Sequence, residues 1–385
     1  MKHSIGIDVS KDSFNYSVVG EKMNEVKCGS FKMDRDGFES FKDVIQIFKD
    51  CIVVMESTGI YHINLLSFIS SFQKEVAVVN PSLIKRFSQN ITLRKTKTDE
   101  IDAFTIARFA SKYGDIIRYF VPHNMDEITA LSRVRESISK DIARVKTQIK
   151  GHLSVVFPEL LAKYNIFTDV MLTVIEAYPT PETVRKATHS AVNRFIGGLK
   201  YKKDITAREL KELAKKSIGV SSSVYEDIIK HDARHLNFLL SELKAVQDRF
   251  ISKLNKTKKD DLEILKSIKG IGEITASHFI AEIKDIKRFK SKEKLIAFAG
   301  TDPSVRQSGT SINTKGRISK KGSKSLRRYI YLMASGVMKF NDYFRVYYLK
   351  KRREGFQHRK AMIALANKLL RVIWSMLTKR ECFNV

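Results

Sequence analysis

The chain has 385 residues, and its 70 Lys and Arg residues outnumber its 42 Asp and Glu residues, which gives a net charge of +28. The length allows two or three domains, the hydrophobic fraction of 43% excludes wholesale disorder, and the surplus positive charge favours a polyanionic partner. The apolar runs are shorter than the roughly 20 residues of a membrane-spanning helix, no signal peptide is visible, and the 3 cysteines fit neither a disulfide framework nor a zinc site. We therefore expect a cytoplasmic protein with no membrane partner.

The first 122 residues alternate strand and helix patterns. Strands are expected over residues 4–9, 14–20, 24–33, 51–56 and 75–80, and helices over 37–48, 61–72 and the stretch from Asp99 to Ala110. Three strands followed by a β-α-β-α pattern predict a mixed sheet with helices on its faces. This block, an α/β domain over residues 1–122, ends at Pro122.

Four acids stand at two kinds of position in this block. Asp8 and Glu56 each end a β-branched run, and Asp99 and Asp102 are three residues apart, so they share one face of a helix. Clustered carboxylates repel one another unless a hard cation neutralises them, and oxygen ligands suit Mg²⁺ or Mn²⁺. Two such ions can bind the attacking and leaving oxygens of a phosphodiester. Taken singly, Asp8 could instead cap a turn, Glu56 could form a salt bridge, and Asp99 could lie in the first turn of a helix, where an acid interacts favourably with the helix dipole.

Residues 123–258 read as a helical segment. Apolar residues recur at gaps of three and four along two stretches, which is the spacing of a heptad seam. The first stretch runs through Ile128, Leu131, Val134, Ile138, Ile142, Val145, Ile149 and Leu153, and the second through Leu236, Leu239, Leu243, Val246, Phe250 and Leu254. This predicts an antiparallel coiled-coil hairpin or a dimerisation stalk, and a plain helical bundle would have the same periodicity. Residues 155–225 carry no recognisable motif.

The third block, residues 259–385, opens with two helical stretches joined by Gly270-Ile271-Gly272. Glycines free the backbone to turn, and exposed N–H groups at a helix N-terminus can bind phosphate. Gly270 and Gly272 are therefore candidate nucleic-acid contacts within a helix-hairpin-helix. An ordinary helical corner would show the same pattern.

A basic run without acids follows, and it leads into an apolar helix. Its members are Lys315, Arg317, Lys320, Lys321, Lys324, Arg327 and Arg328. We interpret it as a surface that contacts phosphates rather than as a solvated loop. A second basic cluster, residues 350–353 with Arg359 and Lys360, flanks the last helix and could simply be solvated.

Ser308 is a candidate nucleophile because it precedes Gly309 and lies close to Arg306, which could hold a phosphate. A serine hydroxyl needs a base or a metal to activate it. From spacing alone a serine before a glycine is a turn residue, and Ser304 and Ser311 are equally plausible.

The order of motifs resembles one family. The motifs are similar, in this order, to those of the DEDD transposases of insertion sequences, a group that is related to the Piv DNA invertases and is also called bridge-RNA-guided recombinases. They are "GIDVSKD", "MESTG", "KTDEIDA", "IKGIGEITA", "FAGTDPSVRQSG", "ISKKGSKSLRR" and "HRKAMIALANKLL". The resemblance covers nearly the whole chain. One departure is Asp302, where an apolar or small residue is expected; it adds an acid near the supposed DNA path.

The resemblance implies an RNase H-like, RuvC-type first domain in which Asp8, Glu56, Asp99 and Asp102 bind Mg²⁺ (or Mn²⁺). It implies a coiled coil next, and then a C-terminal transposase domain with Ser308 as the nucleophile. It also implies double-stranded donor and target DNA, a structured guide (bridge) RNA, a nucleoid-associated location, and dimers or tetramers whose active sites combine residues of different protomers.

The function expected on these grounds is DNA recombination, in which Ser308 forms a protein–DNA ester and Arg306 and the basic run bind the backbone. Base pairing to RNA would then supply sequence specificity. One alternative is a RuvC-like endonuclease that cuts four-way junctions with metal-activated water. Another is an inactive nucleic-acid-binding derivative, although the presence of all four acids and the serine argues against decay.

Overall fold

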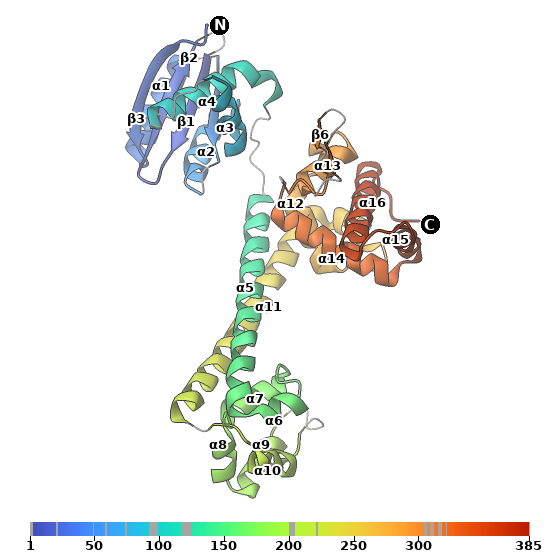
Figure 1. Ribbon diagram of the computed structural model, residues 1–385. Coiled ribbons are helices and arrows are strands. Elements are labelled where there is room, and N and C mark those ends of the chain that lie inside the picture. The colour runs from blue at the N-terminus through green and yellow to red at the C-terminus, as the bar shows by residue number, and fades with distance from the viewer. Residues whose placement is uncertain are drawn as a thin grey trace. The chain divides into compact units, whose positions relative to one another are not determined.

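The computed structural model divides the chain into two compact units, residues 1–123 and 124–385 (Figure 1). Of residues 306–308 and 312–314 the structure describes the backbone alone. The residues that the structure describes are 3–20, 22–48, 50–57, 60–73, 75–91, 99–117, 125–199, 205–220, 222–303, 306–308, 312–314, 318–320 and 322–384.

The first unit contains a mixed five-stranded sheet in the order β3-β2-β1-β4-β5. β1 pairs antiparallel with β2 and parallel with β4, and β4 pairs parallel with β5. The strands are β1 (His3–Val9), β2 (Ser13–Val19), β3 (Glu25–Lys32), β4 (Cys51–Glu56) and β5 (Val76–Val79). The helices are α1 (Arg35–Ile47), α2 (His62–Ser70), α3 (Pro81–Ile91), α4 (Asp99–Tyr113) and the short η1 (Gly114–Ile116).

The sheet is buried on both faces because successive strand residues alternate between two hydrophobic clusters. Phe41 of α1 and Leu65 of α2 pack with Ile5 and Ile7 on one face. The helices α3 and α4 cover the other face, where their apolar side chains join those of β4 and β5. That cluster contains Ile52, Val54, Ala77, Val79, Ile84, Phe87, Ile106, Phe109 and Ala110. A mixed sheet with helices on its faces is therefore confirmed.

The second unit is built on two long helices, α5 (Met125–Val156) and α11 (Ser223–Lys266). Arg135 bonds Gln247 and His152 bonds Asp232, so residue numbers fall on one helix as they rise on the other. The pair is thus an antiparallel hairpin within one chain. α11 has a non-helical residue at Lys258. The short helices α6 (Pro158–Lys163), α7 (Asp169–Ala177), α8 (Pro181–Lys186), α9 (His189–Gly197) and α10 (Ala207–Lys216) lie between them in sequence.

Two separate hydrophobic cores hold this unit together. One joins the short helices to the end of α5 and the start of α11. The other contains Ile128 and Phe250 from the opposite end of the long pair and the C-terminal helices. These are α12 (Glu273–Ile283), η2 (Ile286–Arg288), α13 (Lys292–Ala299), α14 (Lys324–Phe340), α15 (Asp342–Arg353) and α16 (His358–Lys379), with strands β6 (Arg306–Ser308) and β7 (Ile312–Thr314).

Among the described helices, α16 alone is long and apolar enough to cross a membrane by length and composition, and half of that stretch is buried inside the protein. Leu365, Leu369 and Ile373 of α16 belong to the C-terminal core. α16 is therefore a core helix. The largely helical remainder of the chain agrees with the sequence-based expectation, and the division at residues 122 and 258 stays a prediction.

Candidate functional site

Asp8 and Glu56 lie at the ends of neighbouring parallel strands. The pairing of β1 with β4 runs from His3 beside Cys51 to Ile7 beside Met55, so one further step puts Asp8 level with Glu56. Adjacent strands are about 4.8 Å apart, and the alternation of side chains turns both acids toward the face that α4 covers. Both are partly buried. The two strand-end acids predicted from the sequence are thus neighbours.

Asp99 and Asp102 lie in the first turn of α4. This helix packs directly on β1, because a Cβ added to Gly6 would lie 2.2 Å from the Ala107 backbone nitrogen and 2.3 Å from the Ala103 oxygen. Asp99 is exposed and Asp102 is partly buried. Among the described residues, no three His, Cys, Asp or Glu side chains gather closely enough to hold a metal ion. The structure therefore forms two acidic pairs without joining them into a group of three.

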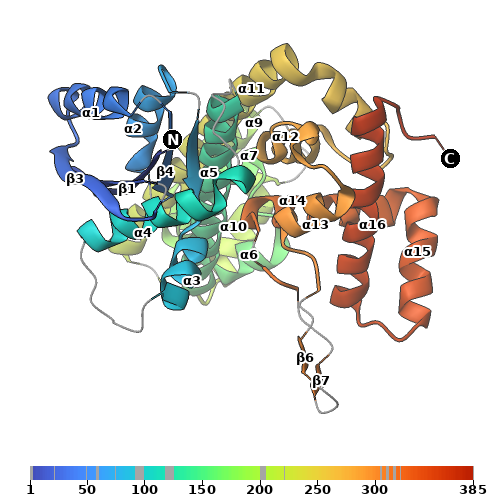
Figure 2. The same ribbon diagram turned by 90° about the horizontal axis from the view of Figure 1, so that it is seen from above.

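Ser308 lies on a two-stranded β-arm between α13 and α14. It ends β6 and pairs with Ile312, the first residue of β7. Figure 2 shows these strands standing away from the helices of the C-terminal core. The placement suits a residue that must reach a macromolecular substrate. Ser304, Gly309 and Ser311 lie outside the described residues.

Four members of the basic run can be placed. Lys320 and Lys324 are exposed, Arg327 donates to the Ala299 backbone oxygen over 3.1 Å, and Arg328 donates to Glu136 over 2.8 Å. The two arginines are thus partly exposed to solvent, and each also forms a hydrogen bond within the protein. Lys315, Arg317 and Lys321 lie outside the described residues, and Arg306 is described by its backbone in β6.

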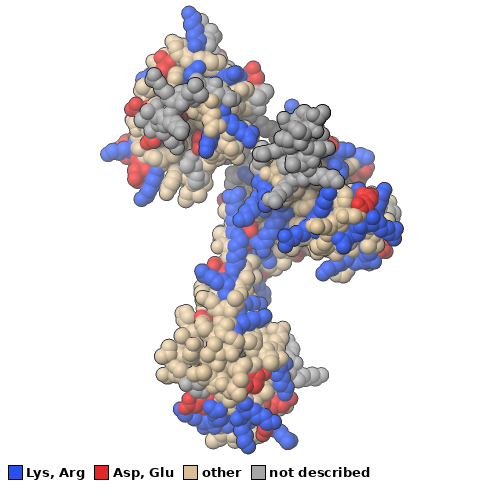
Figure 3. Space-filling model, viewed as in Figure 1, with Lys and Arg blue, Asp and Glu red and all other residues tan. Residues whose placement is uncertain are grey.

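Exposed cations continue from α14 onto α5. The side chains of Arg133, Lys140 and Arg144 are 69%, 66% and 66% exposed. Figure 3 shows Lys and Arg gathered over this part of α5 and over the C-terminal helices. Glu136 lies among them with a side chain 13% exposed. Burial raises the pKa of Glu136, but hydrogen bonds from Lys140 and Arg328 outweigh burial and lower it overall.

The glycines between α11 and α12 have a structural reason of their own. Gly270 has a φ of +101°, and an added Cβ would lie 2.6 Å from the Gly336 oxygen of α14. Gly272 is the N-cap of α12 and has open space around it. Close packing therefore requires a glycine at 270, whereas a contact of either glycine with phosphate stays a prediction.

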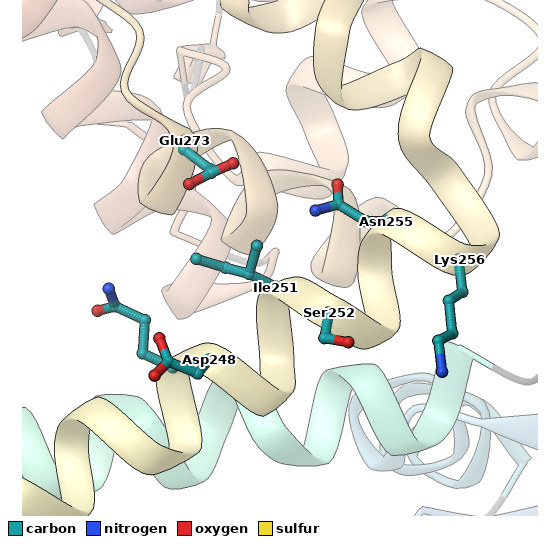
Figure 4. Close-up of a pocket in the computed structure, with 7 residues that line it drawn as sticks. Asp248, Ile251, Ser252, Asn255, Lys256 and Glu273 are labelled. Carbon is teal, nitrogen blue, oxygen red and sulfur yellow. The ribbon is translucent and has the colours of Figure 1, made fainter.

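A pocket of about 640 Å³ lies between α11 and the start of α12 (Figure 4), and Glu273, the residue that follows Gly272, lines it. Its lining carries Asp248 and Glu273 against the single cation Lys256. A lining with more carboxylates than ammonium groups disfavours phosphate. The pocket therefore does not support a phosphate site at this turn.

A buried polar network joins α5 to α12 and α14, and the sequence patterns did not reveal it. His278 is fully buried. Its Nδ1 lies 2.5 Å from the Ser132 Oγ, and its Nε2 lies 3.2 Å from Arg135. Tyr329 stacks on its ring at 4.0 Å. Because an arginine can only donate, Nε2 accepts and Nδ1 carries the proton. Burial, together with the nearby Arg135 charge, lowers the pKa of His278 to about 3.

Comparisons with known proteins match both ends of the chain. Residues 5–158 match a family described as "Transposase", the DEDD type of the insertion sequence IS110. Residues 262–349 match the "Transposase IS116/IS110/IS902 family". These segments contain the four acids and Ser308 respectively.

Individual relatives extend the match to the whole length. A 44.8 kDa protein of insertion element IS116 from Streptomyces clavuligerus is 26% identical over 83% of this chain and 80% of its own length. The pilin gene-inverting protein of Moraxella bovis is 23% identical over 100% of this chain and 98% of its own. The transposase for insertion sequence element IS1111A of Coxiella burnetii is 24% identical over 99% and 91%.

Proposed function

We propose that this chain, which belongs to the IS110 family of DEDD transposases, moves its insertion sequence by a covalent protein–DNA intermediate formed at Ser308. The family makes it an enzyme of DNA transposition and recombination, and DNA is its substrate. Our proposal adds four features to this family assignment: the serine nucleophile, the divalent metal, the guide RNA and the oligomeric assembly.

The observation that supports Ser308 as the nucleophile is its position at the end of β6, on an arm that stands away from the core. The Ser308 hydroxyl oxygen attacks phosphorus, a phosphoserine ester forms, and one bridging P–O bond of the DNA breaks. The hydroxyl proton passes to the leaving DNA oxygen. The ester conserves the bond energy, so the reverse attack by another DNA end can rejoin the strand.

The donor chemistry of the acids fits a hard divalent cation, since Asp8 and Glu56 offer oxygen ligands from adjacent strands and Asp99 and Asp102 from one helix face. When bound, Mg²⁺ or Mn²⁺ would neutralise charge on the attacked phosphate. The mixed sheet with helices on both faces supports an RNase H-like, RuvC-type assignment for the first unit.

The basic run and the cations of α5 would bind the phosphate backbone, which positions DNA without reading its sequence. Sequence would then be read by base pairing to a structured guide RNA. We infer further that the protein works in the cytoplasm as a dimer or tetramer on double-stranded donor and target DNA.

The decisive experiment replaces Ser308 by Ala. The wild-type protein should leave a protease-sensitive adduct on end-labelled element DNA, and Ser308→Ala should abolish both adduct and strand exchange while retaining RNA binding. Ser311→Ala, which changes a serine three residues further along the sequence, is the matched control. Strand exchange by Ser308→Ala would remove the serine mechanism.

One observation favours a second candidate, a junction endonuclease. Asp8 and Glu56 lie together within the first unit, so metal-activated water could cut DNA without the serine. That enzyme would cleave four-way junctions hydrolytically and leave no adduct. Cleavage by Ser308→Ala that needs Mg²⁺ and traps no protein would support it.

A further inference from the structure

The root of the arm that carries Ser308 is firmly paired before the strands β6 and β7 begin. The Ser323 amide donates to the Phe298 oxygen over 2.8 Å, and the Lys320 amide donates to the Gly300 oxygen over 3.1 Å. The Ser319 amide donates to the Asp302 oxygen over 2.9 Å, and Pro303 bridges Ile318. The outgoing segment 298–303 and the returning segment 318–323 therefore run side by side.

Side chains from three helices fix the inner end of this root. Arg327 of α14 donates to the Ala299 oxygen and Asn367 of α16 donates to the Thr301 oxygen, each over 3.1 Å. On the returning chain, the Ser323 hydroxyl donates to Glu282 of α12 over 2.7 Å. Ala299 and Thr301 are fully buried. The arm thus starts from a fixed point in the C-terminal core.

Asp302 lies directly outside that fixed point. Its carboxylate accepts a hydrogen bond from the Ser319 hydroxyl over 2.5 Å, which ties the outgoing chain to the returning one. Bonds between a hydroxyl and a carboxylate are short and about twice as strong as neutral ones. Among the described residues of the arm, this is the side-chain hydrogen bond that lies farthest from the core.

Asp302 is a partly buried acid, and Lys320 of the basic run lies next in sequence to its partner Ser319. An acid beside a phosphate-binding surface would repel DNA, so a role in DNA contact is unfavourable. The bond to Ser319 gives the carboxylate a different use. The carboxylate then serves to orient the arm and not to bind DNA.

We propose that Asp302, acting through Ser319, is a positioning residue that sets the direction of the arm and so the placement of Ser308. The proposal rests on the proposed function, in which Ser308 is the nucleophile. An arm fixed at its base, and held outside it by this side-chain bond as well as by the backbone pairing, cannot pivot freely about the base. Misplacement of a reacting group by about 1 Å can cost about a hundredfold in rate.

The first test measures the adduct rate and the DNA affinity separately. With saturating element DNA, Asp302→Ala should slow adduct formation about tenfold or more. Its Kd for DNA should stay within about twofold of wild type, because the Asp302 carboxylate bonds Ser319 in place of a phosphate-binding role. Asp302→Asn keeps an acceptor oxygen and should recover most of the rate. Asp342→Ala is the control, since Asp342 is an exposed acid on α15, 87% exposed and paired with Arg345.

A double variant tests whether Ser319 is the partner. Ser319→Ala should slow the reaction as Asp302→Ala does, and the double variant should lose no more than either single one, because both remove the same bond. A wild-type rate in Asp302→Ala would overturn the proposal. So would a loss in the double variant equal to the product of the single losses.

The second test does not depend on Ser308 chemistry. Amide hydrogen exchange of Ser319 and Lys320 should become about tenfold faster in Asp302→Ala, since loss of a charged hydrogen bond is worth at least that factor, and it should be unchanged in Asp342→Ala. Unchanged exchange would overturn the tie even if Ser308 proves to be the nucleophile. Faster exchange together with an active Ser308→Ala protein would uphold the tie and refute the serine mechanism instead.

Discussion

At the scale of single residues, His278 is a titratable side chain that the fold buries completely. Burial lowers its pKa to about 3, and its two ring nitrogens meet Ser132 and Arg135. The imidazole is therefore neutral throughout the physiological range. A proton added to it would place a second cation beside the Arg135 guanidinium at a fully buried position.

This environment predicts acid sensitivity. The folded pKa of about 3 lies below the unfolded value of about 6.5, so the contribution to stability is present above pH 6.5 and is lost as the pH falls toward 3. Between these limits the free energy of unfolding should fall by about 1.4 kcal/mol per pH unit from this group. Urea unfolding of the second unit at several pH values measures the slope.

The matched variant is His278→Gln, which keeps an acceptor for Arg135 but does not titrate. Its free energy of unfolding should lie below that of the wild type at pH 7.5, and the two should converge as the pH falls. Curves that stay parallel between pH 6.5 and 4 would show that His278 takes up its proton in the folded state.

At the scale of elements, the strands of the first unit could be predicted from the sequence within one or two residues. β4 shows why. Its residues 51–55 are all buried, and a strand that is covered on both faces has an uninterrupted run of apolar residues, which is easily recognised in the sequence. The helix α3 was not predicted separately. Its Leu83 is 46% exposed while Ile84 and Phe87 are buried, and so few buried positions give a weak periodic pattern.

The candidate site was less accessible to sequence reasoning, because it depends on contacts between distant residues. The strand ends of Asp8 and Glu56 were readable, but the packing of α4 on Gly6 decides how far Asp99 and Asp102 lie from them. His278 meets Ser132 across 146 residues of sequence. A lone histidine in the apolar stretch "ITASHFIAEI" was the available signal for a buried ring.

The junction of α5 and α14 supports a prediction about Glu136. Its carboxylate accepts hydrogen bonds from Arg328 and Ser325 of α14 and forms an ion pair with Lys140. Glu136→Ala should destabilise the second unit by about 1–3 kcal/mol, and it should also raise the affinity for a DNA duplex about threefold, because two cations lose their counter-charge. Urea unfolding and fluorescence anisotropy measure the two effects.

Glu242→Ala is the control for this junction, since Glu242 is an exposed acid on α11. It removes the same charge from the molecule and should change neither quantity appreciably. A lower DNA affinity in Glu136→Ala would mean that Glu136 serves binding by placing Arg328, and not by neutralising it.

At the scale of the whole molecule, the chain consists of two compact units, and the hydrophobic clusters on the two faces of the sheet contain residues of the first unit alone. Units with separate cores can unfold in separate transitions. The strand-end acids and the α4 acids all belong to the first unit. A divalent cation that binds them should therefore stabilise one transition and leave the other in place.

Differential scanning calorimetry with and without MgCl₂ tests this expectation without any measurement of activity. Two transitions are expected, and a cation at a hundred times its Kd should stabilise the first unit by about 2.7 kcal/mol. Asp8→Asn with Glu56→Gln should abolish the shift, because it removes both strand-end ligands while preserving their shape. NaCl at equal ionic strength controls for screening of the +28 net charge. If the shift persists in the double variant, or falls on the transition of the second unit, the cation binds elsewhere and the acids at Asp8 and Glu56 are structural.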